Sequence, residues 1–146
     1  FAELATLRLR DNPLSPDGLA AVLTSTRMPR LTTLDLAQTG GTAASLSGPP
    51  GSDGLVALDL SGNDLGDPGV ELLAGRPELA ALRDLDLSRT GVGDTGAAAL
   101  ADSPYVTGLR RLALNFNRIT EVGKRRLLAV PHFQNLPTLE LRGNWQ

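Results

Sequence analysis

Cysteine is absent from this 146-residue chain, and histidine, methionine, tryptophan and tyrosine each occur once. Without cysteine there is no disulfide framework, thiolate metal site or cysteine nucleophile, so we expect a reducing compartment such as the cytoplasm. No apolar run approaches the ~18 residues needed to span a bilayer, and the first residues do not resemble a signal peptide. These absences predict no membrane association.

The one histidine, His132, has no potential nucleophile and no pair of carboxylates among its sequence neighbours. Nucleophilic and general acid–base catalysis need such groups within hydrogen-bond reach of one another. We interpret His132 as a surface histidine. The sequence predicts no catalytic residues, no metal ligands and no cofactor.

Leucine, by contrast, recurs at fixed spacings along the whole chain. The pattern Leu-x-x-Leu-x-Leu-x-x-Asn first runs from Leu4 to Asn12, and its leucines return five times. Successive copies begin 27, 24, 27, 27 and 27 residues apart. Such a period is typical of a solenoid, in which each unit buries its apolar face against its neighbours. The six units begin near Leu4, Leu31, Leu55, Leu82, Leu109 and Leu136.

Each unit combines a strand signal with a helix signal. Leu-x-x-Leu-x-Leu alternates apolar and polar residues, which predicts a short strand with one buried face. A capping residue or a proline then precedes a second apolar segment, which predicts a short helix. The helix residues expected to face the sheet are Leu19, Val22, Leu23, Val70, Leu73, Ala97, Leu100, Leu127 and Leu128. The prolines expected to close the returns are Pro50, Pro77, Pro104 and Pro131.

The asparagine at the end of the pattern is expected to have a backbone role, because a side-chain amide both donates and accepts hydrogen bonds. It can satisfy main-chain groups where the strand turns away from the sheet, so stacked copies should form a ladder. Thr39 and Thr90 replace it in the second and fourth units. We expect looser turns there, since a hydroxyl is shorter and has one donor.

The second unit departs from the others. It is three residues shorter, Gly40-Gly41 stands where an aliphatic residue is expected, and Ser45 replaces a regularly placed glycine. We predict an irregular loop over residues 40–52 with little or no helix. This segment is either a docking loop or a degenerate repeat that its neighbours tolerate.

The full pattern, Leu-x-x-Leu-x-Leu-x-x-Asn-x-Leu with a later x-x-x-Gly-x-x-x-Leu, resembles the leucine-rich-repeat superfamily, most closely its ribonuclease-inhibitor-like class. Residues 55–73 and 109–127 carry the fullest match, although the 27-residue unit is slightly shorter than in that class. The resemblance implies an α/β fold, a curved right-handed solenoid with a parallel sheet on the concave face and short helices on the convex face. It also implies protein binding through the concave face. The composition of residues 82–101 is similar to bacterial repeat arrays.

We expect residues 1–146 to form a single leucine-rich-repeat domain, an uncapped fragment of a longer array. Phe1 precedes Leu4 in the phase that Met28 and Phe133 occupy in their own units. Solenoids need capped ends, and no cap is visible in the sequence. Uncapped ends could stack on another copy, which would give end-to-end self-association.

Residues between the strand leucines are expected to face solvent on the concave side. Asp35, Asp59 and Asp86 would lie in adjacent strands roughly 5 Å apart, where like charges disfavour joint ionisation. Nothing in the sequence pattern requires three aspartates in a row, so a basic partner is one explanation. A hard cation is a weaker one, because calcium sites want six to eight oxygens. A third is that exposed strand positions simply tolerate aspartate.

Phe116 is an aromatic residue on an exposed column beside Arg89, and clusters of aromatic residues and arginine often anchor interfaces. Alternatively, its ring folds over Asn115 or the neighbouring strand. Trp145, after the last asparagine, we interpret as structural. The residues predicted to bind a partner on the concave face are Asp35, Asp59, Asp84, Asp86, Arg89, Arg111 and Phe116.

Charge is distributed unevenly along the chain. Residues 1–108 hold seven Lys/Arg and fourteen Asp/Glu, whereas residues 109–146 hold seven and two. This asymmetry could orient a partner. Lys124-Arg125-Arg126 lies late in an expected helix, where cations favour the helix dipole, and no aromatic stacking pattern accompanies it. We therefore expect no nucleic-acid binding.

Three functional hypotheses remain open on the sequence alone. The first is a non-catalytic protein-interaction module with a protein partner, basic if the aspartates contact it. The second is a regulator of an enzyme, either an inhibitor or a GTPase activator, which the resemblance also allows. The third is a passive spacer within a larger protein.

Overall fold

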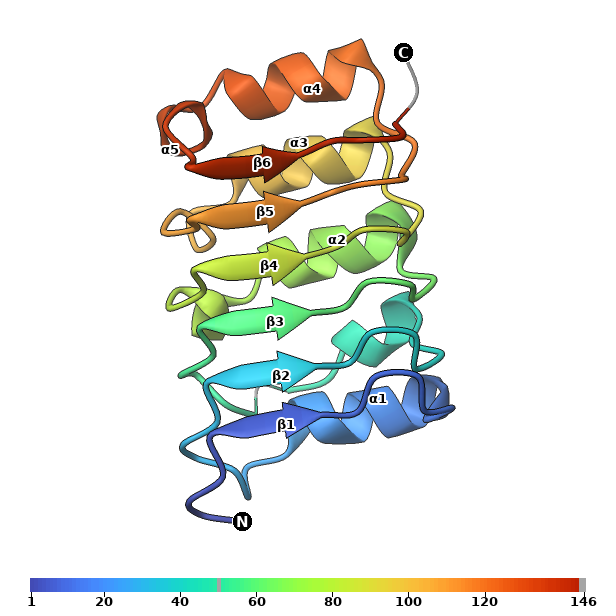
Figure 1. The fold of residues 1–146 in the computed structure, drawn as a ribbon, viewed down its shortest axis with the longest axis vertical. Coiled ribbons are helices and arrows are strands. Elements are labelled where there is room, and N and C mark those ends of the chain that lie inside the picture. Colours follow the sequence, from blue (N-terminus) through green and yellow to red (C-terminus); the bar gives the residue numbers. More distant parts are fainter. Residues whose placement is uncertain (50, 145–146) are drawn as a thin grey trace.

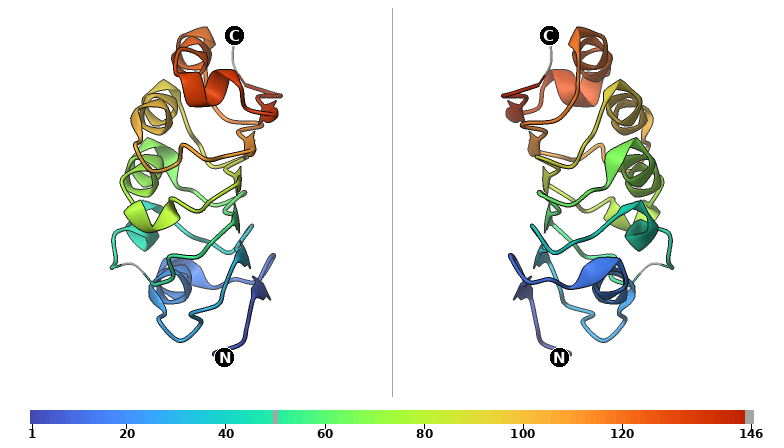
Figure 2. Two further views of the ribbon diagram at one scale, coloured as in Figure 1. Left: turned by 90° about the vertical axis from the view of Figure 1, so that its left-hand side faces the viewer. Right: turned by 90° about the vertical axis from the view of Figure 1, so that its right-hand side faces the viewer.

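A computed structural model describes residues 1–49 and 51–144. Pro50 and Trp145 lie outside the described residues. Strands and helices alternate along the chain in a right-handed coil (Figure 1). The strands line the inner side of a shallow curve and the helices its outer side (Figure 2). The predicted α/β repeat architecture, with a parallel sheet on the concave face and short helices on the convex face, is confirmed.

The six strands form one parallel sheet in chain order. Each strand is three residues long and centred on the middle leucine of its unit, so that the leucines stand opposite one another in register. Their side chains point away from the concave face, and four of the six are at most 2% exposed. The strands are β1 (Thr6–Arg8), β2 (Thr33–Asp35), β3 (Ala57–Asp59), β4 (Asp84–Asp86), β5 (Arg111–Ala113) and β6 (Thr138–Glu140).

Helices cover the convex side. The longer ones are α1 (Ser15–Thr24), α2 (Gly66–Ala74), α3 (Asp94–Asp102) and α4 (Glu121–Leu128). Three short helical segments complete the returns: η1 (Ala43–Leu46), η2 (Pro77–Leu79) and α5 (Pro131–Gln134). Pro77 and Pro131 thus begin short helices, because their fixed φ suits a first turn.

The expected inward faces of the helices are largely confirmed. Leu19, Val70, Leu73, Ala97, Leu100 and Leu127 are at most 1% exposed, and Val22 and Leu23 are partly buried against the same core. The prediction for Leu128 is wrong, because this side chain is 41% exposed. It follows Leu127 by one residue, about 100° around the helix, so α4 turns it to solvent.

The second unit has little helix, as predicted: η1 spans four residues. The third unit holds it in place through Arg76, whose Nη1 donates to the Leu46 carbonyl at 2.7 Å. The Nε of Arg76 donates to Glu78 at 2.6 Å, and these two side chains are only 12% and 11% exposed. A cavity of about 20 Å³ remains beneath this return. These contacts fit a degenerate repeat that its neighbours support.

The asparagine ladder exists, and it runs between units. Asn63 donates through Nδ2 to the carbonyls of Leu36 and Leu60, both at 2.9 Å. Its Oδ1 accepts from the amides of Thr39 at 3.2 Å and Gly41 at 2.8 Å. Asn63 and Asn144 therefore bond the turn of the preceding unit as well as their own, and Asn117 bonds the turn of the preceding unit.

The expectation of looser turns at the two threonines is wrong. Thr39 and Thr90 are 0% and 1% exposed. Each hydroxyl donates to a carbonyl of its own turn, at 2.7 Å and 2.6 Å respectively. The next unit's asparagine supplies the remaining acceptor, as Asn117 Oδ1 does for the Thr90 amide at 2.9 Å.

A second link between units was not anticipated. Asp67 lies in the first turn of α2, yet its Oδ1 accepts from the amides of Gly93 at 2.7 Å and Gly96 at 2.9 Å in the next unit. Asp94 repeats this one unit later with Thr120 at 2.8 Å and Gly123 at 3.1 Å. A Cβ added at Gly96 would lie 2.6 Å from Asp67 Oδ1. The regular glycine therefore lets the carboxylate reach the amides at the helix start, where negative charge is favoured.

We predict that Asn63→Ala lowers the free energy of unfolding by about 3 kcal/mol, because it leaves several buried donors and acceptors without partners. Urea unfolding followed by circular dichroism measures this loss. Asn12→Ala is the matched control: Asn12 bonds only its own turn and is exposed, so its loss should be below about 1 kcal/mol. Equal losses from the two variants would contradict the inter-unit role.

The Asp94 carboxylate should make stability depend on pH. The hydroxyl of Thr120 and the amides of Thr120 and Gly123 hold the pKa of Asp94 below its ordinary value of 3.8. A depressed folded pKa contributes stability above the unfolded pKa, and this contribution is lost as the pH falls through the folded value.

We therefore expect Asp94→Asn to be less stable than the unmodified chain at pH 7. The difference should shrink below about pH 4. Thermal unfolding at pH 7, 5, 4 and 3 tests this. A difference that stays constant with pH would show that the carboxylate's charge contributes nothing.

Candidate functional site

The concave face consists of the outward side chains of β1–β6 and of the turns that follow them. Arg10 lies in the turn after β1 and contacts two of the aspartates expected to repel one another. Its Nε donates to Asp35 Oδ2 at 3.0 Å, and its Nη2 donates to Asp59 Oδ2 at 2.6 Å. The bond to Asp35 raises the pKa of Arg10 further above its usual value. The chain itself thus relieves the repulsion that seemed to call for a basic partner.

The aspartates also have a structural role. Asp35, Asp59 and Asp86 do occupy adjacent strands in register, as expected. Each Oδ1 accepts from the amide two residues on, at 3.1, 2.9 and 2.9 Å respectively. Each aspartate therefore also bonds the backbone at the end of its own strand, although the equivalent positions of β1, β5 and β6 are Arg8, Ala113 and Glu140.

A second ionic network surrounds Arg111 on β5. Its Nη1 donates to Asp84 Oδ1 at 3.0 Å and its Nε to Glu140 Oε1 at 3.1 Å. Asp86 Oδ2 lies 3.6 Å from Nη2. The structure therefore brings Asp84 and Asp86 to the guanidinium of Arg111, and all three residues belong to the predicted set.

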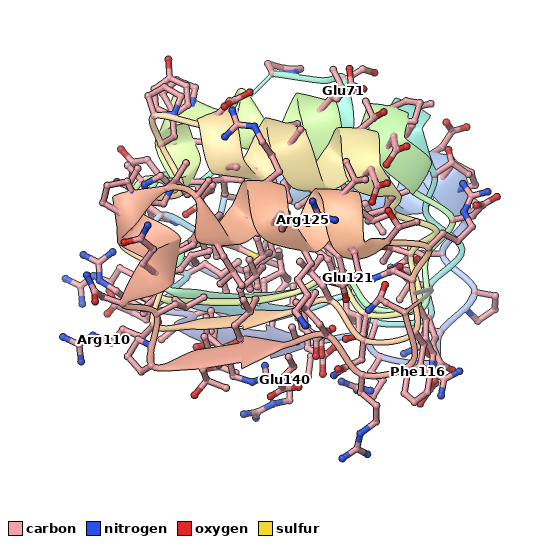
Figure 3. All side chains as sticks on the ribbon, turned by 90° about the horizontal axis from the view of Figure 1, so that it is seen from above. Glu71, Arg110, Phe116, Glu121, Arg125 and Glu140 are labelled. Carbon is pink, nitrogen blue, oxygen red and sulfur yellow. The ribbon has the colours of Figure 1, made fainter. Side chains whose placement is uncertain are left out.

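Glu140, Asn115 and Arg10 belong to these networks but were missing from the prediction. Asn115 Nδ2 donates to Glu140 Oε2 at 2.8 Å. This bond, followed by the bond from Arg111, lowers the pKa of Glu140. Figure 3 shows Glu140 beneath the sheet, on the side opposite the helices. The only sequence signal for these contacts was the register of the strands, which places equivalent positions of successive units side by side on the concave face.

Phe116 lies in the turn after β5, in a left-handed backbone conformation with φ 56°. Arg89, in the equivalent turn one unit earlier, also has φ 56°, and its Cζ lies 4.2 Å from the centroid of the Phe116 ring. On the other side, a Cβ added at Gly143 would lie 2.3 Å from the ring. The ring thus packs over the neighbouring turn, as the alternative interpretation held, and still remains 44% exposed.

The remaining candidates lie elsewhere. His132 is half-buried against the Phe133 ring, at 4.5 Å between centroids. Its Nε2 has no hydrogen-bond partner among the described residues, and burial lowers its pKa. The description as a surface histidine therefore needs correction. The basic triplet lies on α4, where Figure 3 shows Arg125 on the convex side and away from Glu140.

Within residues 1–49 and 51–144, no group of three or more His, Asp or Glu side chains is arranged to hold a metal ion. The aspartates of the concave face thus give no support to the hard-cation interpretation. None of the described helices combines the length and the apolar character needed to cross a membrane.

These observations define an α/β repeat solenoid with a polar concave face. Residues 55–74 and 81–101 match the protein family described as "Leucine Rich repeat". The first matched segment covers β3 and α2, and the second covers β4 and most of α3. Residues 55–101 are therefore leucine-rich repeats of the ribonuclease-inhibitor type. Domains of this kind generally mediate protein binding and are typically non-catalytic. A comparison with curated proteins found no match.

We predict that Arg111→Gln or Asn115→Ala raises the pKa of Glu140 toward its ordinary value, because each removes a donor to the ionised carboxylate. A titration of the Glu140 side-chain carboxyl by carbon NMR measures the shift. Arg110→Gln is the control, since Figure 3 shows Arg110 at the opposite end of the strands from Phe116. An unchanged pKa in both test variants would contradict the network described here.

Proposed function

We propose that this chain is a non-catalytic protein-interaction module that binds a partner protein on its concave face. The observation that carries the proposal is the Phe116 ring, half-exposed yet fixed between Arg89 and Gly143. Exposed aromatic and arginine side chains often dominate binding energy. Side chains that are already ordered lose less conformational entropy on binding.

The proposed contact surface extends from Phe116 across the sheet. It includes the residues of the two ionic networks, which hold their side chains in defined positions before a partner arrives. Six strands at about 4.8 Å spacing give a face on the order of 25 Å long. The partner-binding residues we propose are Asp35, Asp59, Asp84, Asp86, Arg89, Arg111 and Phe116.

The test is a quantitative comparison of proteins captured from a native lysate by the full chain and its variants. We choose Phe116→Asn and Arg89→Asn, because asparagine tolerates the left-handed conformation at these positions. Val122→Ala is the control, since Val122 is 65% exposed on the convex helix α4. Unchanged thermal unfolding confirms that each variant is folded.

We expect a protein bound by the unmodified chain and by Val122→Ala to fall about tenfold or more in recovery with either concave variant. Proteins recovered equally by all baits would refute the concave site, and the absence of any specifically recovered protein would favour a passive spacer. Proteins lost only with Val122→Ala would place the binding surface on the convex side.

A further inference from the structure

We infer that the partner is recognised through a carboxylate, an Asp or Glu side chain flanked by an apolar residue, that docks on Arg89 beside Phe116. This inference rests on the proposed function and names the chemistry of the partner at that site. It reverses the charge expected from the sequence, where three aspartates suggested a basic partner.

The acidic groups of the concave face are already engaged. Asp35 and Asp59 share the guanidinium of Arg10. Asp84 and Glu140 bond to Arg111, with Asp86 close by. A basic partner would have to displace arginines that the fold holds in place, so the exchange would gain little.

The positively charged groups near Phe116 are available by comparison. Within the described residues, the Arg89 side chain has no ion pair and no hydrogen bond to a side chain or carbonyl. Arg118, two residues after Phe116, donates to the Gly91 carbonyl at 3.2 Å and has no carboxylate partner in the described part of the chain. Arg142 follows β6 in the next turn, and its carbonyl accepts from the Phe116 amide at 2.7 Å. Its charge also helps to lower the pKa of Glu140, so it is partly offset by that carboxylate. The end of the concave face at Phe116 therefore carries excess positive charge.

The guanidinium of Arg89 lies over the Phe116 ring, and Arg89 is exposed. A guanidinium over an aromatic face directs its N–H groups outward in its own plane, where they can donate to both oxygens of a carboxylate. Stacking at 4.2 Å orders the side chain in advance. The exposed part of the Phe116 ring then offers apolar contact to a neighbouring residue of the partner, which also shields the ion pair from water.

A protein carboxylate fits this corner better than a nucleic-acid phosphate. Proteins that bind single-stranded nucleic acid combine a basic groove with several aromatic side chains on which bases stack. Within residues 1–49 and 51–144, the concave face presents one exposed aromatic ring, Phe116, where a row of stacking rings would be needed.

The experiment selects peptides from a random 12-residue phage library on the full chain, on Arg89→Asn and on Arg89→Glu. For the unmodified chain we expect enrichment of Asp or Glu next to an aliphatic or aromatic residue. Binding of synthetic copies should weaken about tenfold with Arg89→Asn or Phe116→Asn and stay unchanged with Val122→Ala. Selection on Arg89→Glu should instead enrich Lys and Arg.

Three outcomes would overturn the inference. They are enrichment of basic peptides by the unmodified chain, no enrichment of acidic residues over the starting library, and acidic peptides that bind Arg89→Asn equally well. Tighter binding of a fluorescent 20-nucleotide poly(dT), lost with Arg89→Asn, would also overturn it in favour of a phosphate ligand. A lysate protein lost with Phe116→Asn but indifferent to Arg89→Glu would leave the proposed function standing while refuting carboxylate recognition.

Discussion

The buried amide of the asparagine that ends the leucine pattern is the contact on which the other features depend. Asn117 accepts, through one oxygen, hydrogen bonds from the amides of Thr90, Gly91 and Val92 at 2.9, 3.0 and 3.2 Å. These backbone amides directly follow Arg89. The asparagine side chain of one unit therefore fixes the turn that presents the arginine of the previous unit. The neighbouring turn then places Phe116 beneath that arginine. A solenoid whose units are joined in this way transmits order from the core to its binding face.

The aspartates show how one side chain can serve both strand geometry and surface charge. In Asp59, Oδ1 accepts from the Ser61 amide while Oδ2 accepts from Arg10. Because both oxygens are occupied, the formal charge of this residue says little about what a partner would meet. The charges that matter for recognition are those left outside such networks, and near Phe116 these are arginines.

Much of the fold was predictable because it repeats. The leucine phase fixed the six strands and their register, and the regular glycine marked each helix. The sequence could not reveal that Asp67 and Asp94 act on the following unit, because such contacts depend on the stacking distance between helices. The site was less predictable for the same reason: Arg10 lies 49 positions from Asp59, and only the stacked sheet brings their side chains together. The left-handed turn that aims Arg89 and Phe116 carries no glycine at either position, so the usual signal was missing.

The uneven distribution of charge along the chain is partly offset by ion pairs between units. Arg111 and Arg126 come from the basic segment, but their charge is offset by carboxylates of earlier units. Arg89 and Arg142 near Phe116 remain exposed and outside these ion pairs, and a long-range field from them would help an acidic partner to find this corner. Screening over about 8–10 Å at physiological salt confines that attraction to the final approach. The arginine–phenylalanine stack, rather than the net charge of −2, therefore decides which sign of partner the concave face accepts.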